Sequence, residues 1–323
     1  MAIDRWPMAR TTHHAMGTVM AHSACGPDAE AALNAACREV ARLEGLLSCF
    51  RPESEIGRVN ARAGASAVPV SPETYAVLSS GLDAGTRFAG CFDVTIGPLV
   101  ALWRSARASL APPDAAGIER ALPLVDYRDL LLDSRKGTAA LRHPGQSVDL
   151  GGIGKGLAGD SIREVLRRCG VGSAYSNLGG NVVTLGAKPD GSPWQIGIQH
   201  PREERGLVGA VAVVDEAVVT SGDYQRYFTD RNGRRHHHIL DPTTGYPAAS
   251  GLVSVTIVAG DSLVADVLST ALFVAGMEKG LEHLGRFPGA GAVFVDAGLR
   301  VYVTEGLRSR FRPAEGVRSA ALN

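Results

Sequence analysis

Val148-Asp-Leu-Gly-Gly-Ile-Gly-Lys-Gly156 reads as a short strand that ends in a glycine turn, and residues 153–169 continue it as a helix. A dinucleotide-binding unit opens in the same way, and Gly154-Lys-Gly-Leu-Ala-Gly159 matches G-x-G-x-x-G. Such a unit should place an acid about 20 residues further on, at the end of the next strand. That neighbourhood reads Ala174-Tyr-Ser-Asn177, without a carboxylate. A Walker loop is excluded too, because Lys155 comes before Gly156 and the chain has no Gly-Lys-Ser/Thr.

Strand signals follow this helix in runs, and helices return only near the end. The apolar patterns predict strands at 181–185, 194–199, 207–214, 218–221 and 252–258, helices at 262–275 and 277–284, and a hairpin at 292–295 and 300–304. Before the glycine turn they predict a strand at 16–25, a helix at 29–47, a helix from Ser71-Pro72 toward Phe88 and a short helix from Asp114 to Leu122. Runs of strands between helices favour an α+β fold over a doubly wound sheet.

Length and composition are those of one large domain. The chain has 323 residues, 45% hydrophobic, with 33 basic and 33 acidic side chains. Formal neutrality argues against a general nucleic-acid binder, which needs a basic surface. Residues 1–12 and 311–323 are expected to be loose tails that flank a domain at 13–310.

Cysteine usage and hydropathy predict a cytoplasmic protein. The five cysteines are odd in number and never form Cys-x-x-Cys, so disulfides and zinc are not expected and a reducing compartment is. The chain begins with Met and shows no signal-like apolar run, so no trimmed signal is expected. No window reaches about 18 uninterrupted apolar residues, so membrane insertion is not expected.

Asp266-Val-Leu-Ser-Thr270 is the strongest chemical signal. On a helix, Asp266, Ser269 and Thr270 are three and four residues apart and share one face. The surrounding helix is nearly all apolar, so the carboxylate should be buried and should need a partner or a metal. A carboxylate and a hydroxyl are hard oxygen ligands suited to Mg²⁺, which takes its other ligands from phosphates and water. With a glycine turn and Lys155, this pattern indicates chemistry on a bound pyrophosphate.

Other polar residues leave alternatives open on sequence alone. Lys155 lies among glycines with no bulky neighbour, which favours a phosphate contact over a merely solvated lysine. Asp149 either forms the turn or serves the site. Alternation would put His236 and His238 on one face of a strand and His237 on the other, and only His238 adjoins Ile-Leu-Asp-Pro-Thr-Thr-Gly245. No further cysteine or histidine has the spacing for a zinc site with these histidines.

Two further segments read as structure when taken alone. Cys91-Phe-Asp-Val-Thr-Ile-Gly-Pro98 looks like a strand that closes on Gly97-Pro98. Asn177-Leu-Gly-Gly-Asn181 is a glycine turn that either contacts a ligand or only reverses the chain.

Taken together, the motifs resemble those of the ApbE family, the FAD:protein FMN transferases, from about His14 to Thr304. The matching segments, in the family's order, are His14–Thr18, Phe50–Asn60, Phe92–Leu99, Val148–Gly156, Asn177–Gly180, Thr220–Tyr224, His238–Gly245 and Ala265–Thr270. Any one of them would be weak, but eight in order make chance improbable.

The resemblance implies an α+β, T-fold-like architecture with FAD held between two intimately packed lobes of mixed or antiparallel sheet with helices. It implies Mg²⁺, with Mn²⁺ as the alternative, bound by Asp266, Thr270 and the carbonyl of Gly152. The FAD contacts that it implies are Met16, Phe50, Cys91, Phe92, Asp93, Asp149, Lys155, Leu240 and Ser269.

The reaction implied is transfer of FMN from FAD to a Thr or Ser of an acceptor protein, with release of AMP. Magnesium and Lys155 would neutralise charge on the phosphate oxygens. His238 is the candidate base, because an unperturbed imidazole suits proton transfer near neutral pH. Asp93 is expected to accept from the adenine amino group and Phe50 to stack on a ring.

Departures from the family are small. Many relatives have tyrosine at Phe50 and alanine at Cys91 and Gly154. Relatives with a small polar residue at the Phe50 position hydrolyse FAD, so an aromatic side chain here favours transfer. Many relatives are exported lipoproteins, but this chain lacks a lipobox, so a cytoplasmic acceptor with an Asp-x-x-Ser/Thr-Gly-Ala-Ser/Thr motif is expected. The rival functions are an FAD pyrophosphatase that gives FMN and AMP, and a non-catalytic FAD-binding protein.

Overall fold

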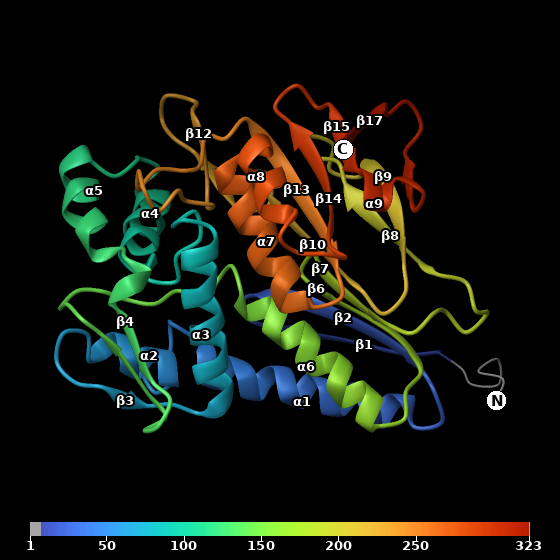
Figure 1. Cartoon of the computed structure of the whole chain (residues 1–323), viewed down its shortest axis with the longest axis horizontal. Coiled ribbons are helices and arrows are strands. Elements are labelled where there is room, and N and C mark those ends of the chain that lie inside the picture. The colour runs from blue at the N-terminus through green and yellow to red at the C-terminus, as the bar shows by residue number, and fades with distance from the viewer. Residues whose placement is uncertain (1–7, 323) are drawn as a thin grey trace.

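A nine-stranded sheet forms the centre of the protein in the computed structural model, which describes residues 8–322 (Figure 1). In spatial order its strands are β1 (Met8–Ala15), β2 (Thr18–Cys25), β6 (Ser173–Leu178), β7 (Asn181–Leu185), β10 (Ala217–Gly222), β13 (Leu252–Ala259), β14 (Gly291–Asp296), β15 (Val301–Thr304) and β17 (Ser319–Leu322). All neighbours are antiparallel except β15 and β17, which are parallel.

Helices and short sheets complete the fold. The helices are α1 (Ala29–Leu47), α2 (Glu55–Ala61), α3 (Pro72–Arg87), α4 (Gly97–Ser109), α5 (Ala115–Ala121), α6 (Gly154–Arg168), α7 (Ser262–Ala275), α8 (Met277–Leu284) and α9 (Glu305–Arg308). There are three short sheets among the described residues. One consists, in spatial order, of β3 (Val68–Pro69), β5 (Thr138–Leu141) and β4 (Leu130–Asp133), and another of β16 (Phe311–Pro313), β9 (Leu207–Val213) and β8 (Trp194–Gln199). The third pairs β11 (Tyr227–Thr229) with β12 (Arg235–His237).

Both faces of the large sheet are covered. Helices α1, α6, α7 and α8 lie on one face and share one apolar core with it (Figure 1). The sheet β16-β9-β8 packs on the other face around valines and Trp194. Strand β13 is buried at every residue because it lies between these layers. A strand buried on both faces reads as a continuous apolar run, which is how it appears in the sequence.

A second lobe of α2–α5 with β3, β4 and β5 lies beside this sandwich (Figure 1). Its helices begin where the sequence provides caps. The hydroxyl of Ser71 accepts from Thr74 N, and the carboxylate of Asp114 accepts from Gly117 N. The α+β class is thereby confirmed, with mixed helices and sheets in two lobes.

Three boundary predictions were wrong. The first strand is a hairpin, β1 and β2, that turns at Met16-Gly17, so residues 8–12 belong to a strand. Strands β16 and β17 occupy most of the expected C-terminal tail and pair with β9 and β15. Gly97-Pro98 begins α4 and does not close a strand, because proline suits the first turn of a helix. Residues 1–7 of the expected N-terminal tail, and residue 323, lie outside the described residues.

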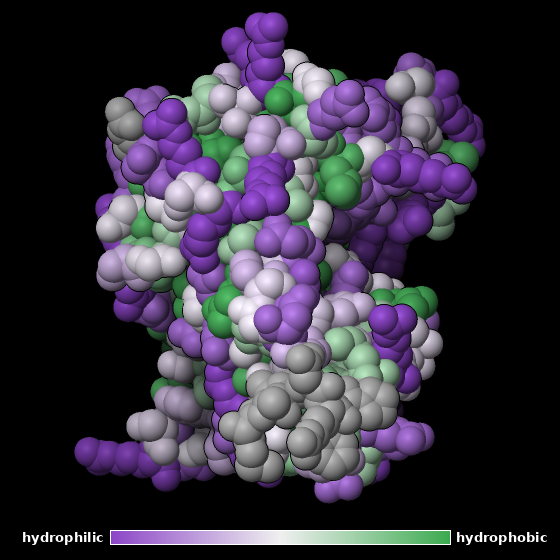
Figure 2. Space-filling view, turned by 90° about the vertical axis from the view of Figure 1, so that its right-hand side faces the viewer, coloured by the Kyte–Doolittle hydropathy of each residue, from purple (hydrophilic) through white to green (hydrophobic). Residues whose placement is uncertain are grey.

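Polar side chains predominate on the face shown in Figure 2, with apolar side chains scattered among them. Within the described residues, no helix is both long and apolar enough to span a membrane.

Candidate active site

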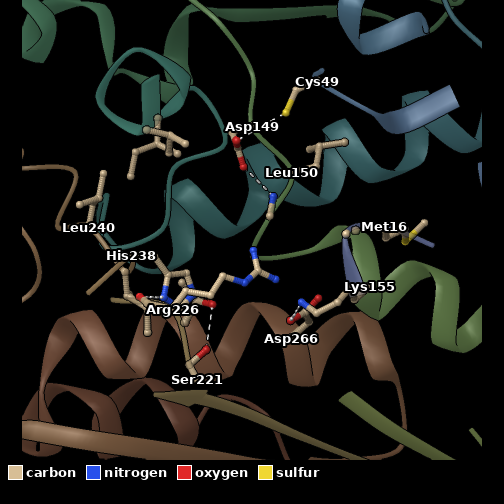
Figure 3. A pocket seen from close by; sticks show the side chains of 18 of the residues that line it. Met16, Cys49, Asp149, Leu150, Lys155, Ser221, Arg226, His238, Leu240 and Asp266 are labelled. Carbon is tan, nitrogen blue, oxygen red and sulfur yellow. Dashed lines mark hydrogen bonds and ion pairs between the residues drawn. The ribbon is translucent and has the colours of Figure 1, made fainter. Parts of the chain in front are cut away.

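A cavity of about 610 Å³ brings together segments that are far apart in the sequence. The turn after β1, the end of α1, the glycine turn before α6, the end of β10, residues 238–242 and α7 all contribute to its wall (Figure 3). Its volume lies within the range of cofactor pockets, about 300–1,000 Å³.

The glycine turn is held by hydrogen bonds at its entrance. The side-chain amide of Asn60 hydrogen-bonds to both backbone groups of Val148: it accepts from the N–H at 2.7 Å and donates to the carbonyl at 3.0 Å. Asp149 then accepts from Gly151 N at 2.8 Å, which fixes the turn. Asp149 therefore shapes the turn and also lines the cavity, and its contact with FAD stays a prediction.

Close packing of α6 against α7 joins the glycine turn to the acidic helix. A Cβ on Gly156 would lie 2.7 Å from Leu263 Cα and 2.8 Å from Asp266 Cβ, so only glycine fits this crossing. Asp160 accepts from Ser262 N and Leu263 N, both at 2.9 Å, and so supplies partners for the first turn of α7.

Asp266 is buried, as expected, with 3% of its surface exposed. One carboxylate oxygen, Oδ2, accepts from Gly156 N at 2.8 Å, and the other, Oδ1, lies 3.9 Å from Lys155 Nζ. In Figure 3 the ammonium of Lys155 lies beside this carboxylate. A separation of 3.9 Å is an ion pair but too long for a hydrogen bond, so Oδ1 keeps its lone pairs.

The residues fit a magnesium ion. The hydroxyl oxygen of Thr270 lies 3.3 Å from where a Cβ on Gly152 would be, so the helix and the glycine turn meet at this point. Asp266, Thr270 and Gly152 all line the cavity. A buried carboxylate oxygen, a hydroxyl and a nearby main-chain segment are the oxygen donors that Mg²⁺ prefers.

Ser269 lies behind the wall. It is fully buried and bonds to Ser221 Oγ at 2.9 Å and to the carbonyl of Asp266. Ser221 itself lines the cavity and also lies 3.2 Å from Thr270 Oγ1. In the structure, Ser269 therefore positions the hydroxyl of Ser221, which in turn lies within hydrogen-bond distance of Thr270 Oγ1.

His238 faces the cavity in one tautomer. Its Nδ1 lies 3.2 Å from the carbonyl of Arg226, which can only accept, so Nδ1 carries the proton and Nε2 has a free lone pair. The open cavity leaves the side chain of His238 exposed to solvent. Desolvation by the protein atoms around the ring, together with the positive charge of Arg226 and then the neighbouring His237, still lowers the pKa of His238. The imidazole is therefore neutral at pH 7 and able to accept a proton.

The other two histidines of the triplet have separate structural partners. His236 is buried, bonds to Asp230 at 2.9 Å and stacks on Phe228. His237 donates from Nε2 to the carbonyl of Ala248 at 3.1 Å. Only His238 reaches the cavity, so the three rings do not form a metal cluster.

Aromatic and apolar contacts occupy the rest of the wall. Phe50 is 67% exposed, with the guanidinium of Arg104 5.1 Å from its ring centre. Phe92 is buried against Gly152. Met16, Cys91 and Leu240 line the cavity as well.

Both carboxylate oxygens of Asp93 accept hydrogen bonds within the protein. Its Oδ1 accepts from the N–H and the hydroxyl of Thr95, both at 2.7 Å, and its Oδ2 accepts from Tyr127 N at 2.8 Å. Burial raises its pKa despite these bonds. Asp93 lines the cavity, but its first role is to hold this loop. The turn at Gly179-Gly180 reverses the chain from β6 to β7, and of this segment Asn181 lines the cavity.

Comparison with known proteins shows the family. A model of the ApbE family matches residues 16–294. The chain belongs to the ApbE family. It is 38% identical to a protein named FAD:protein FMN transferase from Klebsiella pneumoniae over 277 residues, which cover 85% of each chain. A protein of the same name from Treponema pallidum is 37% identical, with 87% of this chain and 83% of the relative covered.

Solved structures of ApbE proteins have the same fold. The ApbE protein of Thermotoga maritima superposes with a TM-score of 0.85 at 32% identity, covering 93% of this chain and 97% of that one. The flavinyl transferase ApbE of Pseudomonas stutzeri, in its apo form, gives a TM-score of 0.80 at 31% identity, covering 93% and 96%.

Sequence reasoning missed several residues of this ApbE-family site. Arg226 and Ser221 line the cavity, and Asn60 and Asp160 hold its backbone. Ser221 and Asn60 lie within the family segments, but no local pattern assigned either of them a role. The partners of these four residues are 12 to 103 residues away in the sequence, so only the folded chain reveals them.

Proposed function

We propose that this ApbE-family chain transfers FMN from FAD to a Thr or Ser hydroxyl of an acceptor protein, in a Mg²⁺-dependent reaction that releases AMP. One observation carries the proposal: Lys155, Asp266, Thr270, Gly152 and His238 converge on a single cavity of about 610 Å³. A cation, a buried carboxylate and a neutral imidazole around one cavity suit transfer from a pyrophosphate.

The charges around the cavity indicate how FAD would be held. Lys155 and Arg226 supply positive charge for the two phosphates. Asp266, Thr270 and the Gly152 main chain would hold Mg²⁺, with Mn²⁺ as the alternative, and the bound ion would neutralise charge on the phosphate oxygens. Phe50, at the exposed rim, offers a ring face to the flavin or the adenine.

His238 is proposed as the base. The hydroxyl oxygen of the acceptor would attack the phosphorus on the riboflavin side as its proton passes to Nε2 of His238. The phosphorus–oxygen bond to the AMP side would break, and AMP would leave with the bridging oxygen. Arg226 supports this role because its carbonyl fixes the tautomer of His238.

The acceptor is proposed to carry an Asp-x-x-Ser/Thr-Gly-Ala-Ser/Thr motif. Cys37, Cys49, Cys91 and Cys169 are free thiols, which suits a reducing compartment, and a cytoplasmic location is part of the proposal. The exposed position of Phe50 beside the cavity leaves a protein segment room to approach.

Mass spectrometry with a motif-bearing acceptor tests the proposal. The chain is incubated with FAD, MgCl₂ and the acceptor, and AMP is measured by chromatography. An adduct of FMN mass on the Thr or Ser, with an equal amount of AMP, supports transfer. Free FMN and AMP without an adduct would instead indicate a pyrophosphatase, and stable bound FAD without AMP a flavin-binding protein. A mutated motif, with Ala in place of the acceptor hydroxyl residue, is the matched control.

A further inference from the structure

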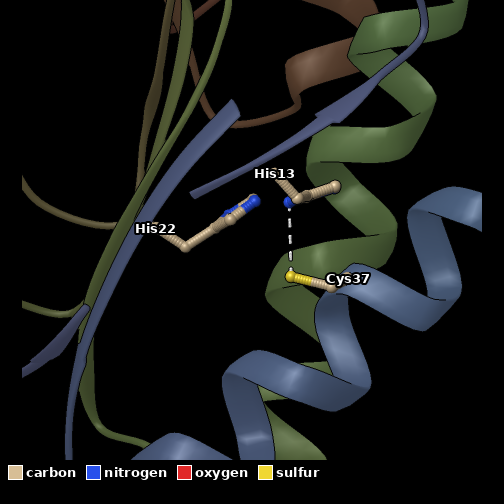
Figure 4. Close-up of side chains that lie close together, drawn as sticks. All are labelled: His13, His22 and Cys37. Atoms are coloured by element: carbon tan, nitrogen blue, oxygen red, sulfur yellow. Dashed lines mark hydrogen bonds between the residues drawn. The ribbon is translucent and has the colours of Figure 1, made fainter. Parts of the chain in front are cut away.

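Three potential metal ligands meet at the edge of the large sheet, outside the cavity. His13 on β1, His22 on β2 and Cys37 on α1 each offer one ligand atom, and these atoms lie within 4.8 Å of one another (Figure 4). In the hairpin, Thr11 pairs with His22 and His13 pairs with Met20, so both rings project from the same face. Helix α1 covers that face and brings Cys37 to them.

The two imidazoles stack on each other, with ring centres 5.0 Å apart, and each has a buried ring nitrogen without a partner. His22 is 2% exposed, and its Nδ1 lies 2.8 Å from Ser176 Oγ on the next strand. If Nδ1 carries the proton, Nε2 of His22 presents a lone pair toward the cluster. This Nε2 is buried without a hydrogen-bond partner, and so is Nε2 of His13. Metal-ligating histidines typically bond to a second group through the other ring nitrogen, as His22 does with Ser176.

The separation of Cys37 and His13 already approaches that of two ligands on one ion. Cys37 Sγ lies 3.3 Å from His13 Nδ1. Tetrahedral zinc, with Zn–S near 2.3 Å and Zn–N near 2.05 Å, would separate such atoms by about 3.5 Å. The ligand atoms within 4.8 Å would need to close by only about 1 Å to share a zinc ion.

We infer that His13, His22 and Cys37 form a binding site for one Zn²⁺ ion, with water as the fourth ligand. Thiolate and imidazole are the donors that zinc prefers, whereas Mg²⁺ prefers oxygen. Binding would release the thiol proton of Cys37 and give the buried Nε2 of His22 a partner.

The site would tie the hairpin to α1 next to the cavity. His14 and Met16 follow His13 and line the cavity, and the end of α1 leads into Phe50. Zinc would thus stabilise two walls of the cavity without touching the reacting groups.

Zinc titration of the metal-free protein tests the inference. Protein treated with a chelator and then returned to buffer with excess MgCl₂ is titrated with ZnCl₂ against a chromophoric competitor. We expect one equivalent of Zn²⁺ bound, about one proton released, and a higher unfolding temperature. CoCl₂ should give a thiolate charge-transfer band that Cys37→Ser abolishes. Cys37→Ser should lower zinc affinity on the order of 100-fold or more, and Ser176→Ala by about 10- to 100-fold.

Matched variants separate this site from other ligands. Cys169→Ser and His143→Asn change an exposed cysteine and an exposed histidine and should keep full zinc affinity. Asp266→Ala should keep it too, since that residue belongs to the other cation site. Unfolding of the metal-free variants, which should match that of the parent, shows that Cys37→Ser still folds. Zinc affinity unchanged by Cys37→Ser, or lost in Asp266→Ala, would overturn the inference, as would the absence of a cobalt–thiolate band.

Discussion

Adding one methyl group at Gly156 should separate the two helices that build the site. The new Cβ would lie 2.7 Å from Leu263 Cα and from the carbonyl oxygen of Ser262, and both are backbone atoms that cannot rotate away. Relief to ordinary contact distance requires a shift of roughly 0.7–1 Å between α6 and α7. Overpacking of this kind costs about 1–3 kcal/mol. Gly156→Ala should therefore lower the free energy of unfolding despite the better helix propensity of alanine.

Gly154→Ala is the matched control for stability. It makes the same chemical change two residues earlier on α6, but its nearest neighbour would be Leu150 Cβ at 3.9 Å, an ordinary contact. This variant should be neutral or gain about 0.5 kcal/mol, because the unfolded chain loses freedom. The two variants should thus differ by about 1–3.5 kcal/mol.

Urea unfolding followed by tryptophan fluorescence measures this difference, and AMP release measures its consequence. The Gly156 N–H holds Oδ2 of Asp266, so the shift should also misplace the carboxylate relative to Lys155. A displacement near 1 Å can lower the rate about 100-fold. If Gly156→Ala unfolds at the same urea concentration as Gly154→Ala or at a higher one, the close approach of α6 and α7 is not what requires glycine.

Three other outcomes follow from the same geometry. Asp266→Asn keeps an acceptor for Gly156 N–H but loses the charge, so AMP release should fall on the order of 1000-fold with little change in the free energy of unfolding. Persistent AMP release would show that Asp266 does not belong to the cation site. Because the pKa of His238 lies below its usual value near 6.5, the neutral base persists below that pH. In the pH profile of kcat/KM, the fall on the acid side should therefore lie below pH 6.5, and it should disappear in His238→Ala. A fall centred above pH 6.5 would contradict the assignment of His238 as the base. Asn60→Leu should lower the free energy of unfolding by about 2–4 kcal/mol, because Val148 loses the partner of both its N–H and its carbonyl. Asn60→Asp keeps the acceptor, so it should cost about half as much in urea unfolding. Equal costs would be inconsistent with two hydrogen bonds from Asn60 to Val148.

The sequence predicted helices well where an apolar stripe and a cap agree. The periodicity at 29–47 gives α1 with the same bounds, and Ser71-Pro72 gives the start of α3. It failed at the turn of the first hairpin, because Met16 adopts a positive φ of 49° that methionine rarely takes. It also failed at β17, where Ser319–Leu322 pairs in parallel with a strand that no local pattern identifies as its neighbour.

The candidate site was predictable only in part, for a physical reason. Asp266 could be predicted as buried, since one acid on an apolar helix needs a partner. The identity of that partner could not, because Gly156 lies 110 residues away and meets Asp266 only when α6 crosses α7. Asp93 was expected, from the family resemblance alone, to accept from the adenine amino group. In the structure Thr95 and Tyr127 donate to its two oxygens, and the contact with adenine stays a prediction.

In the proposed reaction, the arrangement of Lys155 and Asp266 would let one site serve a cation and a phosphate together. Were the ammonium hydrogen-bonded to the carboxylate, each charge would satisfy the other and neither would be available. At 3.9 Å the ammonium of Lys155 and Oδ1 of Asp266 attract each other without a hydrogen bond, and the Gly156 N–H holds the other carboxylate oxygen, Oδ2. Since the backbone sets both positions, the donors need no reorganisation when charge develops between them. The glycines of α6 are therefore as much a part of the chemistry as the charged side chains that they bring together.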